Sequence, residues 1–284
     1  MIDISFLAQL KKFHIIVNKK VTSSFTGSRR SSSTGQGIVI SDFRPYTPGD
    51  DFRAIDWKVY ARTDEFFIKR YEEERNLTTH VLLDVSKSMD YGTTKIKKFE
   101  YASMLALGFA YLSMRSNEKF NLSLVSDKTE FLRAKRSSNQ ILGFLNHLNK
   151  VKLKGAIQFE DQMKKYRKSL KSKSLVIIIS DFLYDIEQIK NTLHLFKNHE
   201  VKVIQILDSS ETNFKVYGSV ILEDSETGKE METYITETKR QEFRERLYKH
   251  ITQIEHETLS IGGKFFLFST EEPLFNAFYK IVNN

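Results

Sequence analysis

The hexapeptide DVSKSM, residues 84–89, places one carboxylate and two hydroxyls at alternating positions. Asp84, Ser86 and Ser88 follow the apolar run HVLL, so they stand where a buried strand would end. Oxygen atoms at this spacing can face one point and hold a hard cation such as Mg²⁺. A strand can also end in polar residues because it reaches solvent, and an acid there can cap the next helix. Both interpretations are open at this stage.

A second carboxylate occupies the equivalent place in another apolar run. SLVIIIS, residues 174–180, contains four consecutive β-branched residues and is followed by Asp181. The carboxyl ends of parallel strands meet at one edge of a sheet, which is where open α/β sheets bind ligands. The two strand-end acids, Asp84 and Asp181, are therefore expected to converge on one site.

The chain from residue 79 onward alternates between strand and helix patterns. A long apolar helix is predicted over 95–117, a short strand TEFLRA should pair with the strand before it, and residues 213–236 form a late β-hairpin. This order predicts an α/β fold whose mainly parallel, doubly wound sheet is flanked by helices. The main strands are expected at HVLLDVS (80–86), KFNLSLVS (119–126), SLVIIISDF (174–182), EVKVIQILD (200–208) and GGKFFLFS (262–269).

The N-terminal part has a different pattern. Ile4, Leu7, Leu10 and Phe13 share one face of a predicted helix, which we expect to dock on the protein's own core. Residues 22–37 are dominated by Ser, Thr and Gly and read as a loop whose role the sequence does not define. We therefore expect an N-terminal extension over residues 1–75, followed by an α/β domain over residues 76–284.

The composition narrows the class of protein. The 284 residues are 40% hydrophobic and 28% charged, as in folded soluble proteins, and there is no cysteine for disulfides, thiol catalysis or Cys-bound zinc. No apolar run approaches the roughly 18 residues that span a bilayer, and no signal peptide is recognised, so a cytoplasmic protein is expected. Indirect association with a membrane through a partner remains open.

The net charge of +8 raises the question of nucleic-acid binding. The Lys and Arg residues are scattered among acids, and no dense basic run with stacking aromatics occurs, so nucleic acid is not the expected partner. The chain also lacks G-x-x-x-x-G-K-[ST], G-x-G-x-x-G, H-E-x-x-H and G-x-S-x-G, and its seven His residues show no ligand spacing. The expected function is therefore not enzymatic.

The D-x-S-x-S motif after the first buried strand, together with the second strand-end acid, resembles the metal-ion-dependent adhesion site of von Willebrand factor type A (vWA) domains. The resemblance implies that Ser86 and Ser88 bind Mg²⁺ or Mn²⁺ directly, and that Asp84 and Asp181 hold it mostly through water. An open coordination position would then accept a carboxylate from a partner. These domains usually add a Thr ligand from a later loop, and the position that aligns with it here is Ala156, which offers no hydroxyl.

A narrower resemblance lies upstream, over FRPYTPGDDFRAIDWKVYARTDEFFIKRYEEERN (43–76). This stretch is similar to the signature of the domain of unknown function 58 family, R-x-Y-x-P-G-D-D-x-R-x-I-D-W followed by A-R. Members resemble proteins that accompany MoxR-type AAA+ ATPases, which implies a partner of that kind. The matching residues are Arg44, Tyr46, Pro48, Gly49, Asp50, Asp51, Arg53, Ile55, Asp56, Trp57, Ala61 and Arg62.

The same segment can be interpreted as local architecture. TPGDD predicts a turn in which Gly49 takes a positive φ, and Asp50 or Asp51 can cap the helical turn that follows. The only tryptophan, Trp57, is expected to be buried against the α/β core. Arg44, Arg53, Arg62, Asp51 and Asp56 would then pair, because charges near a buried ring need partners. The alternative is that this Arg/Asp cluster receives a partner or a phosphate.

Taken together, these patterns favour a non-enzymatic protein-interaction adaptor with a vWA-like metal face, acting with a MoxR-type AAA+ ATPase in the assembly or activation of a complex. A Mg²⁺-dependent phosphotransfer or hydrolytic enzyme that uses Asp84 and Asp181 is an alternative. A basic nucleic-acid-binding accessory protein is another, and its affinity would fall steeply with salt.

Overall fold

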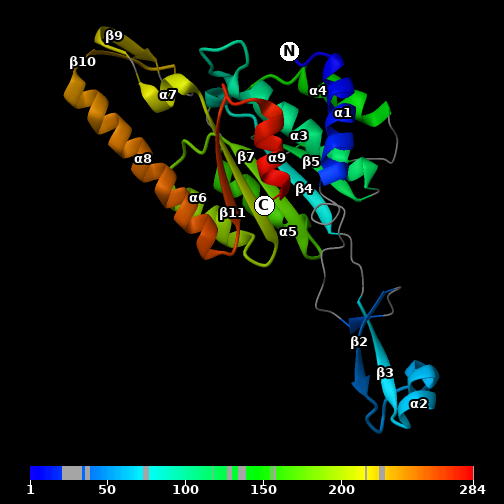
Figure 1. Cartoon of the computed structure of the whole chain (residues 1–284). Coiled ribbons are helices and arrows are strands. Elements are labelled where there is room, and N and C mark those ends of the chain that lie inside the picture. The colour runs from blue at the N-terminus through cyan, green and yellow to red at the C-terminus, as the bar shows by residue number, and fades with distance from the viewer. Residues whose placement is uncertain are drawn as a thin grey trace. The chain divides into compact units, whose positions relative to one another are not determined.

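A computed structural model describes residues 1–20, 34–35, 39–72, 77–116, 118–126, 130–133, 139–153, 155, 158–214, 216–223 and 228–283. The chain divides into two compact units, both drawn in Figure 1. The larger unit combines Met1–Ser24 with Thr78–Asn284, and the smaller unit is Phe25–Leu77. The N-terminal helix thus belongs to the larger unit, whereas residues 1–75 were expected to form one extension.

The larger unit is built on a six-stranded sheet with the order β11-β8-β7-β4-β5-β6. Every neighbouring pair from β11 to β5 is parallel, and β6 adds to β5 in the antiparallel direction. This confirms the predicted mainly parallel, doubly wound α/β fold. The strands are β4 (Thr78–Asp84), β5 (Phe120–Val125), β6 (Glu130–Arg133), β7 (Ser174–Ser180), β8 (Glu200–Leu207) and β11 (Lys264–Ser269).

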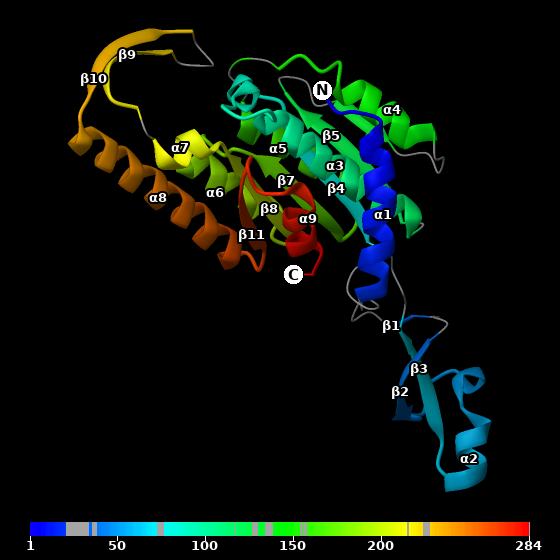
Figure 2. The same ribbon diagram turned by 45° about the horizontal axis from the view of Figure 1, so that its top comes forward.

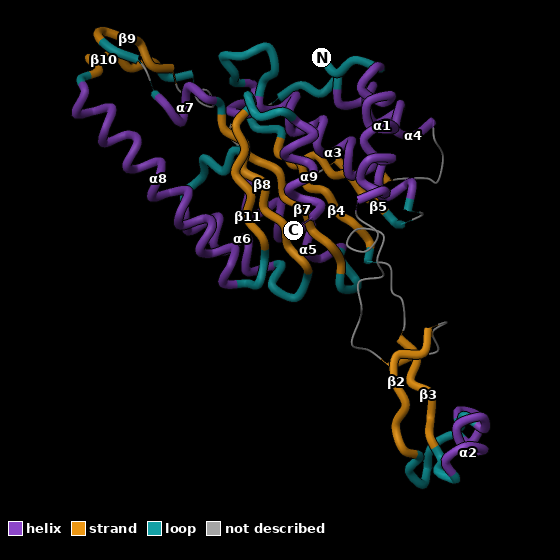
Figure 3. The backbone as a smooth tube through the Cα atoms, viewed as in Figure 1, coloured by secondary structure: helices purple, strands orange, loops and turns teal. Residues whose placement is uncertain are grey.

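Helices cover both faces of this sheet, as the apolar β4 and β7 require. On one face lie α3 (Lys98–Arg115) and α9 (Leu274–Asn283), with α1 (Ser5–Lys20) and α4 (Asn139–Leu148) beside α3 (Figure 2). On the other face lie α5 (Phe159–Ser169), α6 (Ile186–Leu195) and α8 (Glu237–Ser260), as the tube in Figure 3 shows.

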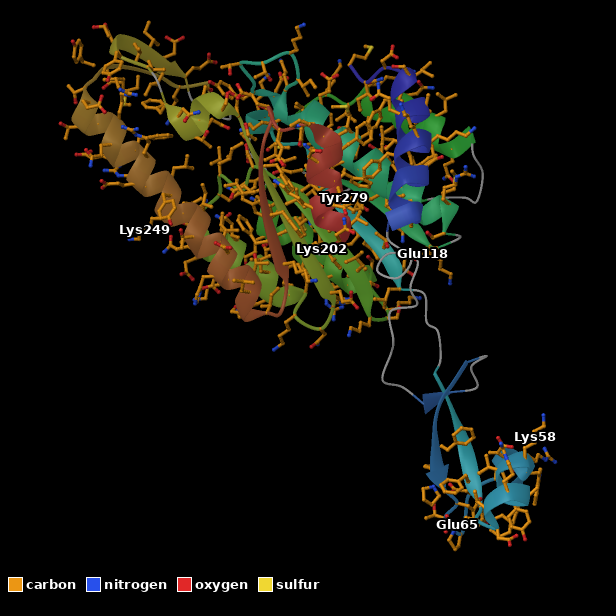
Figure 4. All side chains as sticks on the ribbon, viewed as in Figure 1. Lys58, Glu65, Glu118, Lys202, Lys249 and Tyr279 are labelled. Carbon is orange, nitrogen blue, oxygen red and sulfur yellow. The ribbon has the colours of Figure 1, made fainter. Side chains whose placement is uncertain are left out.

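Close packing fastens α9 to its neighbours. A Cβ at Gly108 of α3 would lie 3.0 Å from ring atoms of Phe278, so the absence of a side chain lets the two helices approach. Lys202 on β8 is buried, and its ammonium donates to the carbonyl of Ile281 at 2.6 Å (Figure 4). The last helix is therefore an integral part of the larger unit.

The N-terminal helix docks on the same face. Phe6, Leu10 and Phe13 are buried, and the Phe13 ring lies 5.0 Å from the ring of Phe275. The predicted docking of this helix is confirmed. The predicted face was wrong in one position, because Ile4 is 63% exposed.

The predicted late hairpin is confirmed as β9 (Gly218–Glu223) and β10 (Glu230–Ile235), which pair in the antiparallel direction after the short helix α7 (Ser209–Asn213). Throughout the described residues, none of the helices combines the length and apolar character that crossing a bilayer requires.

The smaller unit is an antiparallel sheet with the order β1-β3-β2, together with short helical elements. As predicted, Gly49 takes a positive φ of 109° in the turn. The predicted helical turn is divided into two pieces, each capped by an aspartate. The elements are β1 (Thr34–Gly35), β2 (Val39–Pro45), the 3₁₀ turn Phe52–Ala54, α2 (Trp57–Thr63) and β3 (Phe67–Glu72).

Candidate functional site

The two predicted acids lie at the carboxyl ends of adjacent parallel strands. β4 and β7 pair directly, with Leu83 opposite Ile179, so Asp84 and Asp181 follow at the same edge of the sheet. Both carboxylates are buried. The chain leaves β4 for β5 on one side while β7 lies on the other, which makes this edge the switch point of the doubly wound sheet.

The Asp84 carboxylate is held by hydroxyls and a backbone amide. One of its oxygens, Oδ1, accepts from the Ser86 N–H at 2.8 Å. The other, Oδ2, accepts from the Ser180 hydroxyl at 2.6 Å and from the Tyr184 hydroxyl at 2.9 Å. Burial and the nearby charge of Asp181 raise the pKa of Asp84 above its ordinary value, and these hydrogen bonds only partly offset the rise.

The two serines of the motif lie side by side. Ser86 and Ser88 flank the start of the 3₁₀ turn Lys87–Asp90, which follows the strand directly, and their hydroxyl oxygens are 3.0 Å apart. Ser86 is buried and Ser88 is half-buried, so the pair lies between the buried carboxylates and the surface. The structure thus brings Asp84, Ser86, Ser88 and Asp181 to one edge.

A buried lysine also belongs to this edge, and nothing in the sequence distinguished it. The Lys98 ammonium lies 2.8 Å from Asp181 Oδ2 and 2.7 Å from Glu211 Oε1, and the Lys98 side chain is 0% exposed. Burial disfavours the charged form, but the two carboxylates outweigh it and raise the pKa of Lys98. Lys98 is therefore an ammonium that neutralises Asp181.

A third strand-end acid, Asp208 after β8, forms hydrogen bonds with residues from three different segments of the chain. It accepts hydrogen bonds from Thr93 Oγ1 at 2.6 Å, from Ser210 Oγ at 2.7 Å and from Thr270 Oγ1 at 3.0 Å. Burial opposes its ionisation, but these hydroxyls and backbone N–H groups hold the pKa of Asp208 well below its usual range. Its position after the apolar run EVKVIQIL is the signal that could have identified it.

The donor types at this edge fit a hard cation. Serine hydroxyls and carboxylates are the oxygens that Mg²⁺ and Mn²⁺ accept. Among the described side chains, no group of three or more His, Cys, Asp and Glu residues could hold a metal, so a cation here would depend on the serines. The position aligned with the usual Thr ligand, Ala156, lies outside the described residues.

The signature segment in the smaller unit pairs its charges differently from the expected network. Arg44 binds Asp50 with two parallel hydrogen bonds of 2.7 and 2.6 Å, which hold the pKa of Asp50 far below its ordinary value. Asp51 and Asp56 cap the two helical pieces by accepting from the N–H groups of Arg53 and Lys58. The guanidinium of Arg62 donates to the Lys58 carbonyl at 3.2 Å.

Trp57 was expected to be buried, but its own unit does not bury it, and 57% of it is exposed there. Short strands and one helix of two turns give this unit too little volume to enclose the ring. Trp57 instead packs edge-on against Tyr60 and Phe66, at centroid distances of 6.1 and 6.3 Å. These rings belong to an aromatic cluster, which consists of Tyr46, Phe52, Trp57, Tyr60 and Phe66.

The aromatic cluster lies partly in solvent. Phe52 is 66% and Phe66 is 44% exposed, and the charged side chains of Lys58 and Glu65 extend into solvent from the same unit (Figure 4). Exposed apolar groups in a contiguous set are typical of interaction surfaces. This property, rather than an Arg/Asp network, distinguishes the signature segment.

The sheet order and the D-x-S-x-S motif at the end of its first strand define the larger unit as a vWA-like α/β domain. The chain belongs to the family described as "Protein of unknown function DUF58", whose model matches residues 42–256. It is similar to the uncharacterized protein Rv1480 of Mycobacterium tuberculosis (strain ATCC 25618 / H37Rv), with 24% identity over 266 residues. That match covers 92% of this chain and 84% of the relative.

Solved structures give more distant matches. The protein BatB from Bacteroides thetaiotaomicron is 14% identical, with a TM-score of 0.45, over 73% of this chain and 96% of that one. The VWA domain of SpRpn10 is also 14% identical, with a TM-score of 0.45, over 72% of this chain and 95% of that one.

Proposed function

We propose that this chain is a non-enzymatic adaptor that recognises a protein partner at the carboxyl-end edge of its sheet. The observation that carries the proposal is the pair of serine hydroxyls, 3.0 Å apart, beside two buried strand-end carboxylates. Such an arrangement presents oxygen donors toward the surface while the acids behind them stay shielded from solvent. The family model covers the residues of this edge, and its description names no function.

The cofactor in this proposal is Mg²⁺ or Mn²⁺. Ser86 and Ser88 would hold the cation, and Asp84 and Asp181 would add negative charge from behind. When bound, the cation supplies an open coordination position that a carboxylate of the partner can occupy. The residues of this chain orient the hydroxyls, exclude bulk water from the acids and keep Asp84 hydrogen-bonded to Ser180 and Tyr184.

The partner in this proposal is a MoxR-type AAA+ ATPase, which the family resemblance implies. The signature segment, with Arg44, Tyr46, Asp50, Asp51, Arg53, Asp56, Trp57 and Arg62, is a second surface for that partner. Its exposed aromatic cluster supports this role, because rings that remain in solvent gain most from being covered by another protein.

The test is a binding measurement between the full chain and a purified MoxR-type ATPase from the same organism. The Ser86→Ala/Ser88→Ala variant should weaken binding by at least about tenfold, and a chelator should weaken wild-type binding to a similar extent. Ser219→Ala, on an exposed position of β9, is the matched control and should bind like wild type. Equal binding by the double variant and wild type would overturn the proposal.

A further inference from the structure

Resting on the proposed function, we infer that Lys98 is a built-in counter-ion that competes with the divalent cation for Asp181 and keeps the cation affinity of the site low. Asp84, Ser86, Ser88 and Asp181 together form what we call the carboxyl-end site, and Lys98 would regulate its affinity for a cation. Its two strand-end acids occupy equivalent places in adjacent strands.

The two acids have different partners. Asp181 receives the Lys98 ammonium at 2.8 Å, and both side chains are essentially fully buried, at 1% and 0% exposure. The described partners of Asp84 are two hydroxyls and a backbone N–H, and none of these carries a charge. The site therefore already contains one cation, and it lies on the Asp181 side.

Lys98 is held firmly in this position. Its ammonium also binds Glu211, whose other carboxylate oxygen accepts from the Asp208 N–H at 2.7 Å in the capping box of α7. The Tyr91 ring lies 5.7 Å from the ammonium and covers it from another direction. Because Lys98 extends from the first turn of α3 into these contacts, moving it aside would break one buried and one partly buried ion pair.

A divalent cation at the serines would meet this fixed positive charge. Asp181 cannot give its full charge to the cation while it neutralises Lys98, and like charges repel strongly where water is excluded. The same ammonium makes the folded chain independent of a metal, because Asp181 is neutralised without one. The divalent cation should therefore bind weakly until a partner's carboxylate adds negative charge.

The experiment is calorimetric titration of Mg²⁺ and of Mn²⁺ alone into the full chain. Lys98→Met, which is one heavy atom shorter and removes the charge, should bind the cation at least about tenfold more tightly than wild type. Lys97→Met is the matched control, because the neighbouring Lys97 is half-exposed and pairs with Asp90, and it should change the affinity less than about twofold.

A double-mutant cycle identifies the carboxylate for which Lys98 and the divalent cation compete. Asp181→Asn in the Lys98→Met background should remove the gain in cation affinity, whereas Asp181→Asn in wild type should have a smaller effect. If Lys98→Met does not fold, Lys98→Met/Glu211→Gln removes one charge of each sign, leaves Asp181 free and should show the same gain. Both Lys98 variants can also be followed by the rise of Tm with added Mn²⁺.

Cation affinity that is the same in wild type and in both Lys98 variants would overturn the inference. So would micromolar binding by wild type, because the competitor would then have no effect. These failures are distinct from failure of the proposed function, which is decided by partner binding in the Ser86→Ala/Ser88→Ala variant. Partner binding can depend on the serines whatever Lys98 does to a metal.

Discussion

The carboxyl-end site and the signature segment both contain ion pairs and aromatic rings, but they differ in which of these is buried and which is exposed. At the carboxyl-end site, Lys98 and Asp181 form an ion pair that solvent does not reach, and hydroxyls surround the remaining acid. In the signature segment, the Arg44–Asp50 pair lies partly in solvent, and it is the aromatic rings that are left exposed.

The size of each unit explains the difference. The larger unit covers both faces of its sheet with helices, so side chains at the strand ends can be enclosed from several directions. The smaller unit, residues 25–77, has too little volume for a core that would hold its rings. In the larger unit, burial forces charged side chains to pair with one another. In the smaller unit, little is buried, and the aromatic rings remain on the surface.

The largest expected effect on this comparison comes from removing the buried ammonium. Lys98→Met leaves Asp181 and Glu211 without their cation, and it should lower the free energy of unfolding by about 3 to 5 kcal/mol. Urea denaturation measures the loss. Asp50→Asn, which breaks the partly exposed pair with Arg44, should cost clearly less. Equal losses of unfolding free energy in the two variants would show that burial does not make the Lys98 pairs more important for stability than the Arg44–Asp50 pair.

An intermediate effect is expected from His80 on β4, whose Nδ1 lies 2.7 Å from the Tyr166 hydroxyl. Burial, with a contribution from His199, lowers the pKa of His80 to about 4. The His80 imidazole therefore stays unprotonated in the native state between pH 6.5 and 4, whereas in the unfolded chain the same imidazole binds a proton over this range. Stability that is complete above pH 6.5 should fall as the pH drops toward 4, by about 1 to 2 kcal/mol for this partly solvated ring.

Denaturant unfolding at a series of pH values tests the His80 prediction. His80→Gln should flatten the slope of stability between pH 6.5 and 4, while His256→Gln, on an exposed position of α8, should leave it unchanged. A slope that survives His80→Gln would assign the acid sensitivity to other groups.

The smallest effect on stability is expected at the aromatic cluster. Trp57→Ala should change the free energy of unfolding by less than about 1 kcal/mol, because most of the ring is already in solvent. Phe159→Ala in the core of the larger unit should cost about 3 to 5 kcal/mol. Binding to the ATPase should follow the reverse order, with the larger loss at Trp57. A large loss of stability from Trp57→Ala would mean that the cluster is structural.

The backbone-level features of the site could be predicted from the sequence. Continuous apolar strands separated by helical patterns imply a parallel sheet, and the acids that follow two of those strands must then share an edge. Asp208 obeys the same rule after a third strand and was available to the same reasoning. These inferences need only the order of the elements and the period of their apolar residues.

Side-chain partners from distant parts of the chain could not be predicted in this way. Lys97 and Lys98 are adjacent in KIKKF, yet one is half-exposed and the other has no solvent contact. Lys97 is the extended N-cap residue of α3 and pairs with Asp90, whereas Lys98 is the first helical residue and reaches Asp181. Trp57 was misjudged for a related reason. A lone tryptophan suggests burial, but whether a core exists around it depends on the size of the unit that contains it.

The hydrogen bonds of Asp208 have a consequence for the order of folding. They join Thr93 and Thr270 to one carboxylate across sequence separations of 115 and 62 residues, and Lys98 reaches Glu211 across 113. Contacts of such length form late, because the intervening chain must already be ordered. A nascent chain that ends before β8 would contain DVSKSM, Lys98 and Asp181 but would lack Asp208 and Glu211. The hydrogen bonds around the carboxyl-end site are thus completed only after the chain has been made as far as Thr270, so binding at this site would require that later segment to be folded.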